Sequence, residues 1–485
     1  MKLLCSILLI SYLALIVPSV PPIPGLLALL GAVFLITLKK PSLGLIVISF
    51  LVSSYVIVRW KDFDSILLAG FRTEIFTIFI SACILRSILF KDDILKFYND
   101  PIFFLFIFWC LLCFSINSNF NIQLFTLAIR ENLEAWFLLP FVISIFKRDI
   151  RVIKLVACAL VFGASFVALI NVLNYYNLII INIPAYVEAK NFTHERNLLG
   201  FSVKRMNPFF GIGPSGGGQY YASMFIQAFL LIFILIQEKF SYFRYKLVKF
   251  NIIFMSLFAS FLLLVYASLL TASVSSFGSI AIVLIILNSQ LKLTASPVTL
   301  FRKVTIPVLV ILFLTIVDLK ILLGINVGSS WDYLTDYFIR FGINLIDRSS
   351  NLLTGNSLSL RTASTVVGTD SLGVIDVSWF ALIEKFGILG FVLGILFTLK
   401  YTYLFLSASI AKYYRHIFTL SGVLLVSLLS YSHAPPIITR PFDYLAMISV
   451  AGIYSIVRLK SRTNDKFLVS VQGGMKESRL INAEN

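Results

Sequence analysis

The stretch DVSWFALIEKFGILG, residues 376–390, marks the point where a long polar segment gives way to an apolar one. The polar segment covers residues 325–376 and is rich in arginine and aspartate, although only 13% of the whole chain is charged. The residues that follow Gly390 are almost all apolar. We therefore expect residues 325–376 to form a long water-facing loop that is held by membrane-embedded helices around it.

The composition of the chain indicates the class of protein. Of the 485 residues, 59% are hydrophobic, and the mean hydropathy is +0.94. A soluble domain is about half apolar and a quarter charged, so these values indicate an integral membrane protein. The apolar runs have the length of a membrane-spanning helix, about twenty residues, and lack the alternation of a β-barrel strand. We predict an all-α polytopic membrane protein with about 12–14 transmembrane helices.

The candidate membrane spans are residues 3–20, 25–38, 41–58, 73–90, 101–117, 121–146, 152–174, 216–237, 251–270, 274–291, 304–324, 377–400, 417–433 and 441–457. The first span is more typical of a retained helix than of a cleaved signal peptide, because no clear small-residue cleavage site follows it. The predicted parts of the chain are N-terminal transmembrane helices (1–174), central transmembrane helices with a first outward loop (175–324), the long loop (325–376), C-terminal transmembrane helices (377–460) and a polar tail (461–485).

The net charge of +17 is distributed in a way that argues against nucleic-acid binding. Lysine and arginine lie in short clusters in alternate connections between spans, which is the pattern of cytoplasmic loops. These clusters include Lys39, Lys91, Lys147, Lys239, Lys292, Lys412 and Arg458. Both termini are therefore predicted to be cytoplasmic, and the loops 175–215 and 325–376 are predicted to face outward.

The outward loop 175–215 contains a candidate anion-binding element. Arg205 lies shortly before a glycine-rich turn, residues 211–218, that opens an apolar span. Such a turn presents unpaired backbone N–H groups at the positive end of the helix dipole. The alternative is that the Gly-Ile-Gly-Pro sequence within it simply ends the loop.

The long loop supplies three arginines, Arg340, Arg348 and Arg361. Arginine binds phosphate oxygens in a bidentate manner and never loses its charge, so arginines on an outward loop suit a diphosphate. The alternative is that they form local ion pairs with the aspartates of the same loop.

Other polar residues near the predicted membrane surface are also candidates. Asp376 is either the N-cap of a helix or a general base. Arg130 lies within an apolar span and either pairs with Glu134 one turn away or faces a substrate. His194 and His433 are outward histidines that suit acid–base chemistry or plain hydrogen bonding, and Arg440 follows on the same side. The Cys110-x-x-Cys113 pair lies among apolar residues, so we interpret it as packing.

Three motifs, taken in order, resemble those of the O-antigen ligase and O-antigen polymerase superfamily of bacterial inner-membrane proteins. Arg205, with the Asn-Pro pair after Met206, resembles the family's arginine-led motif before a central helix. Residues 269–273, Leu-Leu-Thr-Ala-Ser, resemble its Thr-x-Ser-Arg turn. Arg340, residues 352–356 and Asp376 resemble its long periplasmic loop and the start of the next helix.

Two departures from the family pattern bear on the choice between its members. Val274 stands where the turn motif has an arginine, and Asp376 stands where the ligases place a histidine. Because the ligases use that histidine in catalysis, the resemblance favours a polymerase.

The resemblance implies a metal-independent glycosyltransferase without a cofactor, with a fold similar to lipid-linked GT-C-like glycosyltransferases. It would polymerise undecaprenyl-diphosphate-linked oligosaccharide repeat units into O-antigen, capsule or exopolysaccharide at the periplasmic face. Arg205 and Arg340, with Arg361, would hold the donor's diphosphate, and Asp376 would orient or deprotonate the acceptor hydroxyl. The implied partners are the lipid-linked donor and acceptor, membrane lipids and a chain-length regulator.

Two alternatives remain open at this point. A ligase would transfer finished glycan to the lipid A-core of lipopolysaccharide from the same donor. A flippase or transporter for the lipid-linked oligosaccharide would carry its polar residues inside the spans, whereas the charges here concentrate in outward loops. A structural membrane subunit without catalysis is less consistent with the outward arginines.

Overall fold

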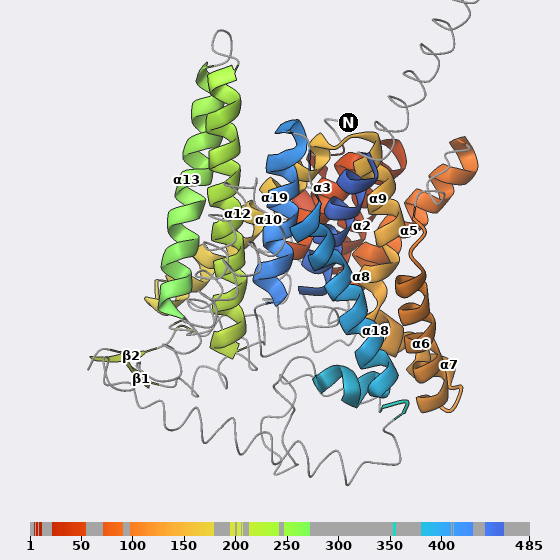
Figure 1. Cartoon of the computed structure of the whole chain (residues 1–485). Coiled ribbons are helices and arrows are strands. Elements are labelled where there is room, and N and C mark those ends of the chain that lie inside the picture. Colours follow the sequence, from red (N-terminus) through yellow and green to blue (C-terminus); the bar gives the residue numbers. More distant parts are fainter. Residues whose placement is uncertain are drawn as a thin grey trace, which may run out of the picture.

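The computed structural model of the protein describes residues 4, 6–7, 9–11, 22–54, 71–90, 98–178, 195–198, 201–204, 206, 213–241, 247–271, 353–355, 380–408, 410, 412–429 and 442–459 (Figure 1). Its labelled helices are α2 (Pro22–Lys39), α3 (Pro41–Ser53), α5 (Phe71–Phe90), α6 (Pro101–Asn117), α7 (Ile122–Asn132), α8 (Glu134–Phe137), α9 (Leu139–Arg148), α10 (Arg151–Tyr175), α12 (Gly213–Ser241), α13 (Leu247–Leu270), α18 (Phe380–Ser407) and α19 (Lys412–Leu429). A last helix covers Phe442–Leu459. The strands β1 (Glu195–Leu198) and β2 (Phe201–Lys204) form an antiparallel hairpin in which Glu195 pairs with Lys204.

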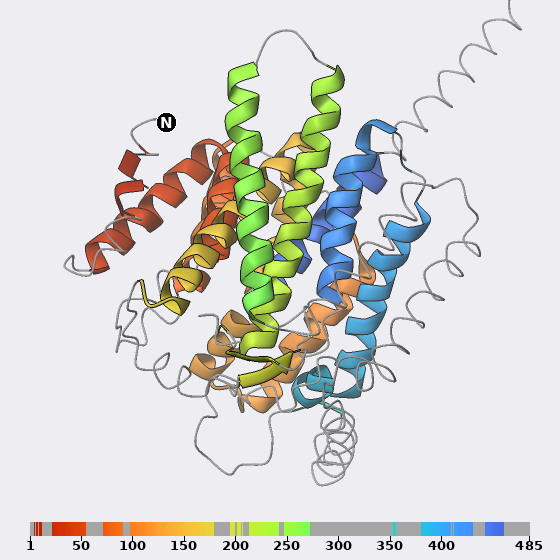
Figure 2. The ribbon, with the colours of Figure 1, turned by 90° about the vertical axis from the view of Figure 1, so that its left-hand side faces the viewer.

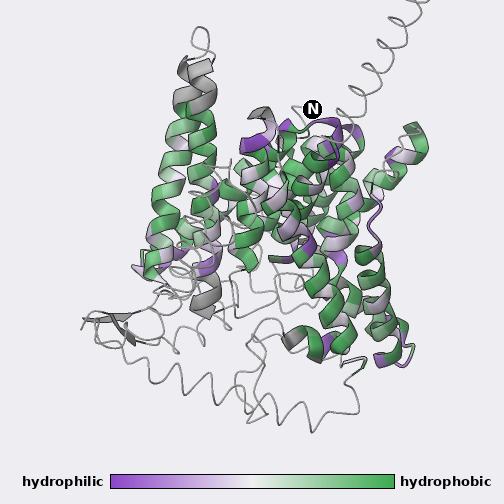
Figure 3. Ribbon diagram, viewed as in Figure 1, coloured by the Kyte–Doolittle hydropathy of each residue, from purple (hydrophilic) through white to green (hydrophobic). Residues whose placement is uncertain are grey.

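The helices have the length and composition expected of a helical membrane protein. Among the described residues, five helices are long and apolar enough to cross a membrane: Arg151–Tyr175, Gly218–Ile236, Ile252–Leu270, Lys385–Ser407 and Phe442–Leu459. Figure 3 shows hydrophobic residues along the lengths of the helices and many of the hydrophilic ones near helix ends. The prediction of a helical membrane protein is therefore confirmed. The predicted spans 274–291 and 304–324 lie outside the described residues.

The last helix, Phe442–Leu459, forms the core of the bundle. In its apolar window 83% of the residues are buried, compared with 28% in the window Ile252–Leu270 of α13. Its Tyr444 is fully buried, hydrogen-bonds the Ser49 hydroxyl of α3 at 2.9 Å, and stacks on the Phe76 ring of α5 with centroids 5.3 Å apart.

Figure 2 shows α12 and α13 side by side, extending beyond the neighbouring helices at one end.

Helices α3 and α10 pack closely because small residues face each other. A Cβ atom added at Gly163 of α10 would meet the Ser53 hydroxyl and would lie 2.7 Å from the Phe50 carbonyl oxygen of α3. Helices in membranes depend on such contacts, since lipid supplies no hydrophobic driving force for their association.

We therefore expect Gly163→Ala to destabilise the protein by about 1–3 kcal/mol, because the two helices must separate to admit the methyl group. Gly31→Ala is the matched control, since a Cβ atom at Gly31 meets no atom within 4 Å. Thermal unfolding of both purified variants in detergent measures the difference. Equal melting temperatures for the two variants would contradict the proposed close packing.

Contacts at one end of the bundle join basic connections that are far apart in sequence. The Arg86 guanidinium donates to the carbonyl oxygens of Leu38 and Lys39 at 2.7 and 3.1 Å, at the end of α2. The Lys147 ammonium and the Arg458 guanidinium lie over the Tyr454 ring, 5.1 and 5.6 Å from its centroid. Such contacts between helix ends are compatible with the predicted alternation of basic connections, which itself remains a prediction. We call this end the basic end.

The prediction of one continuous span over residues 121–146 is wrong. This stretch forms three helices, α7, α8 and α9. The first break lies at Leu133, whose φ and ψ are −122° and −13°. Just before it, the Asn132 side chain donates to the Ala128 carbonyl oxygen at 2.9 Å and competes with the helical backbone. The second break lies at Leu138, before Pro140, whose ring clashes with the carbonyl one turn earlier and removes an N–H donor.

Candidate functional site

Most of the site residues predicted from the sequence lie outside the described residues. These are Arg205, Arg340, Arg348, Arg361, Asp376, His194, His433 and Arg440. For Arg130 the structure describes the backbone, which lies in α7, but not the side chain. The structure therefore bears on the predicted site only through described residues that are close to these in the sequence.

Two of the family-like motifs meet through their described residues. The backbone N–H of Met206, which follows Arg205, donates to the Leu270 carbonyl oxygen at 2.8 Å. Met206 is buried, and Leu270 ends α13 within the predicted turn motif, residues 269–273. The next residue of that turn, Thr271, is buried and donates to the Ser268 carbonyl oxygen at 2.6 Å. The arginine-led motif and the turn motif are thus joined by a buried backbone hydrogen bond.

The long polar loop has one described point of attachment. The Asn117 side chain at the end of α6 donates to the Gly355 carbonyl oxygen at 3.2 Å. Gly355 has φ of 65°, a conformation that glycine adopts without strain, and it belongs to the motif at residues 352–356. Figure 1 shows this segment, the β1–β2 hairpin and the start of α18 at the same end of the molecule, opposite the end of α12 and the start of α13. We call this end the outer end.

Helix α18 also breaks near the outer end, at Gly387, where φ is 69° and ψ is −175°. This conformation is essentially restricted to glycine, and it interrupts the helical hydrogen bonding. The Phe386 carbonyl oxygen instead accepts from the Trp109 indole N–H at 2.8 Å and from the Cys113 thiol at 3.8 Å, both on α6. Cys110 and Cys113 are both buried in the hydrophobic core, where their side chains pack against apolar neighbours.

A hydrogen bond connects the break in α18 at Gly387 with the break after α7 at Leu133. The Lys385 ammonium donates to the Asn132 side-chain oxygen at 2.8 Å. Asn132 is 4% exposed, and Glu134, just beyond the break in α7, is 6% exposed and accepts from the Thr77 hydroxyl at 2.6 Å. We call Asn132, Glu134, Lys385 and the two breaks the outer junction. Ionisable residues inside membrane spans are costly and mark functional sites, so the outer junction is a candidate site for a polar ligand.

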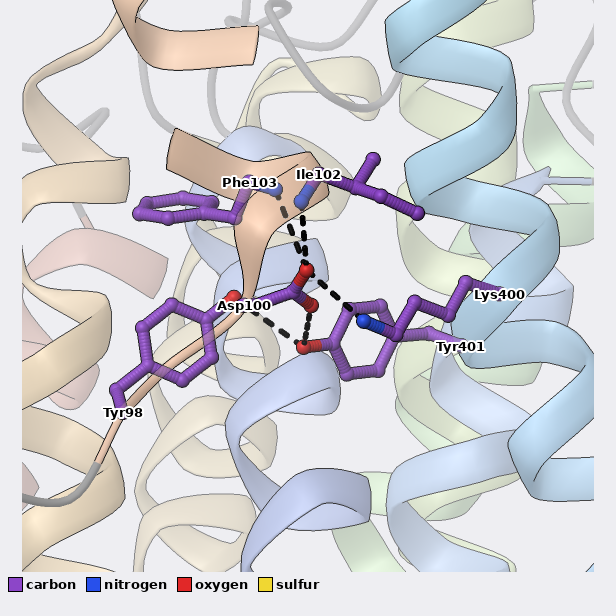
Figure 4. Close-up of polar contacts among 6 residues, drawn as sticks. All are labelled: Tyr98, Asp100, Ile102, Phe103, Lys400 and Tyr401. Atoms are coloured by element: carbon purple, nitrogen blue, oxygen red, sulfur yellow. Dashed lines mark hydrogen bonds and ion pairs between the residues drawn. The ribbon is translucent and has the colours of Figure 1, made fainter. Parts of the chain in front are cut away.

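A second polar cluster lies at the other end of α6 and α18 (Figure 4). Asp100 is fully buried and caps α6, since its Oδ1 accepts from the backbone N–H groups of Ile102 and Phe103 at 3.0 and 3.3 Å. The same oxygen lies 2.8 Å from the Lys400 ammonium, and Oδ2 accepts from the Tyr401 hydroxyl at 2.7 Å. The carboxylate is thus held by four donors, which offsets the cost of burying its charge.

Tyr98 completes this cluster. The Tyr401 hydroxyl gives its one proton to Asp100, so the Tyr98 hydroxyl, 3.2 Å from that of Tyr401, is the donor between them. Burial raises the pKa of Tyr98 above its usual range, and the nearby Asp100 carboxylate adds to this shift. The hydroxyl therefore keeps its proton at physiological pH. The Tyr98 ring also packs edge-on against Tyr454, with centroids 5.1 Å apart, which places the cluster at the basic end.

Sequence reasoning missed Asp100, Lys385 and Lys400. Asp100 precedes Pro101 at the start of an apolar span, which is a recognisable helix N-terminus. The two lysines stand inside or beside an apolar span, and charges in such positions signal a partner. These signals could have marked the residues, although not what they bind.

Comparison of the chain with protein-family models, with curated proteins and with solved structures finds no match.

Proposed function

We propose that the protein is a glycosyltransferase that joins oligosaccharide repeat units carried on undecaprenyl diphosphate, at the periplasmic face of a bacterial inner membrane. The observation that carries this proposal is the gathering of described motif residues at the outer end. Met206 is hydrogen-bonded to Leu270, and Gly355 is hydrogen-bonded to Asn117. The end of α13 and the segment 353–355 lie at the same end of the bundle (Figure 1), which supports a site built from both motifs.

The proposed chemistry needs an anion site and a base. Arg205, Arg340 and Arg361 hold the donor's diphosphate and neutralise the charge that develops on it. The acceptor hydroxyl oxygen bonds to the donor's anomeric carbon as the bond from that carbon to the diphosphate breaks. Asp376 takes the hydroxyl proton, and undecaprenyl diphosphate leaves.

The direct test is incubation of the purified protein with lipid-linked repeat units, followed by separation of the products by length. We expect a ladder of lipid-linked chains from the wild type and none from Asp376→Asn, which keeps the shape of the side chain but cannot accept the proton. If the wild-type products remain one repeat unit long, the polymerase proposal fails. Transfer of preformed long chains to a lipid A-core acceptor would identify a ligase instead.

A flippase for the same lipid-linked oligosaccharide is a second candidate, and the buried ionisable residues favour it. Glu134 lies in a broken span, and the buried Asp100 is paired with Lys400 within the span Lys385–Ser407. Broken helices with polar residues are typical of transporter sites. Proteoliposomes that move the lipid-linked unit between leaflets without lengthening it would favour this candidate over the enzyme.

A further inference from the structure

The outer half of α6, from Trp109 to Asn117, is hydrogen-bonded to two described segments that are separate in the sequence. The Asn117 side chain donates to the Gly355 carbonyl oxygen at 3.2 Å. The Trp109 indole N–H donates to the Phe386 carbonyl oxygen at 2.8 Å. The chain is therefore held by α6 at Gly355 and is held by the same helix again at Phe386.

The two attachments are neighbours on α6. The Phe386 ring lies 5.4 Å from the Phe114 ring, measured between centroids. Phe114 stands three residues before Asn117, and residues at this spacing lie next to each other on a helix, about 4.5 Å apart along its axis. The residues that flank the stretch 356–385 are thus held within about one helical turn of each other on α6.

The attachment at Phe386 is closely packed. Phe386 is fully buried, and its ring packs edge-on against that of Phe106, with centroids 6.3 Å apart. A Cβ atom added at Gly390 would collide with the Phe386 side chain and would lie 3.3 Å from Cδ1 of Trp109. Directly after Phe386 the helix is interrupted at Gly387, where φ is 69°. A buried ring, a close helix contact and a hydrogen bond together fix this point on α6.

We propose that α6 positions the stretch 356–385 for catalysis, with Trp109 and Asn117 as the positioning residues. This assignment rests on the proposed function, because that function assigns the donor to Arg361 and the acceptor hydroxyl to Asp376, which both belong to this stretch. Holding the two ends of a loop at one place restricts the conformations that the loop adopts. Catalytic groups need such restriction, since a displacement of about 1 Å can cost a hundredfold in rate.

The first experiment measures amide hydrogen exchange of the purified full-length protein in nanodiscs. We compare the wild type with Trp109→Phe, which keeps an aromatic ring but removes the N–H donor, and with Asn117→Ala. Ser115→Ala is the matched control, because the Ser115 hydroxyl lies on the same helix and donates to the Leu111 carbonyl oxygen within α6 at 3.0 Å. Thermal unfolding of each variant shows that it is folded.

Each variant is expected to loosen its own end of the stretch. Loss of one hydrogen bond should raise the exchange rate about tenfold, in peptides that cover residues 380–390 for Trp109→Phe and residues 352–356 for Asn117→Ala. Ser115→Ala should leave both regions unchanged.

The second experiment measures the kinetics of chain lengthening by the same variants. We expect kcat to fall about tenfold to a hundredfold in Trp109→Phe and in Asn117→Ala, because the base is no longer held in place. The KM for the lipid-linked donor should stay within about threefold of the wild type, since Arg205 and Arg340 lie outside the stretch. A purely structural role would lower the melting temperature without separating kcat from KM.

Unchanged exchange in folded Trp109→Phe and Asn117→Ala overturns the attachment, and if one variant does not fold, the other decides. Raised exchange with an unchanged kcat overturns the positioning role. An equal loss of kcat in Ser115→Ala also overturns it, because contact with the stretch would then not be the cause. Failure of the proposed function looks different: the wild type would lengthen no chains, whereas the exchange rates would still show whether α6 holds the two ends.

Discussion

Alanine at Arg205 or at Arg340 is expected to abolish chain lengthening while the protein still accumulates in the membrane. Each guanidinium, in the proposed mechanism, stabilises the negative charge that builds on the diphosphate as the glycosidic bond breaks. Removing one such donor from an enzyme costs about 10²–10³-fold in rate. The measurement is the length distribution of glycan from cells that carry each variant, together with the amount of protein in the membrane fraction.

Arg415→Ala is the matched control for these two variants. Arg415 is an exposed arginine of α19, in a connection predicted to face the cytoplasm. Its loss removes a guanidinium from the chain without touching the predicted donor site, so long glycan should persist. Wild-type glycan length in both Arg205→Ala and Arg340→Ala would remove these residues from the proposed mechanism.

Lys400→Met is expected to destabilise the protein by about 3 kcal/mol, because it leaves the buried Asp100 carboxylate without its cation. The value is at the low end for buried pairs, since the Lys400 side chain is 33% exposed and only Asp100 is fully buried. Unfolding of the purified protein by denaturant or heat measures the loss.

The double variant Asp100→Asn with Lys400→Met is the control for this effect. Asparagine caps a helix about as well as aspartate, so it keeps the bonds to the start of α6 while removing the charge. We expect the double variant to recover most of the stability that Lys400→Met loses, because no buried charge is left uncompensated. If the double variant is no more stable than Lys400→Met, the ion pair does not account for the effect.

The sequence predicts the helical elements well because the length of an apolar run is set by the thickness of the membrane. The sequence also predicts which helix ends lie on the same side, since each span reverses the side of the membrane on which the chain emerges. The contacts of Arg86 with the end of α2, and of Lys147 and Arg458 with Tyr454, agree with that alternation. The choice of cytoplasmic face, and the sites in the long loop, remain predictions.

The polar clusters could not be predicted in the same way because their partners are distant in sequence. Lys385 and Asn132, or Lys400 and Asp100, are brought together only by tertiary structure, in which α18 packs against α6 and Lys385 reaches the end of α7. No local pattern specifies such a pair. The break at Leu138 has a local cause in the sequence, because Pro140 stands inside the predicted span and proline interrupts a helix.

The burial of the helix Phe442–Leu459 has a consequence for biogenesis. This helix emerges from the ribosome after every other described element, yet Tyr444 and Tyr454 provide contacts for α3, α5 and the segment before α6. The earlier helices therefore insert into the bilayer first and cannot complete their packing until translation is nearly complete. If translation stalls before residue 442, the surfaces that normally pack against this helix stay exposed to membrane quality-control proteases.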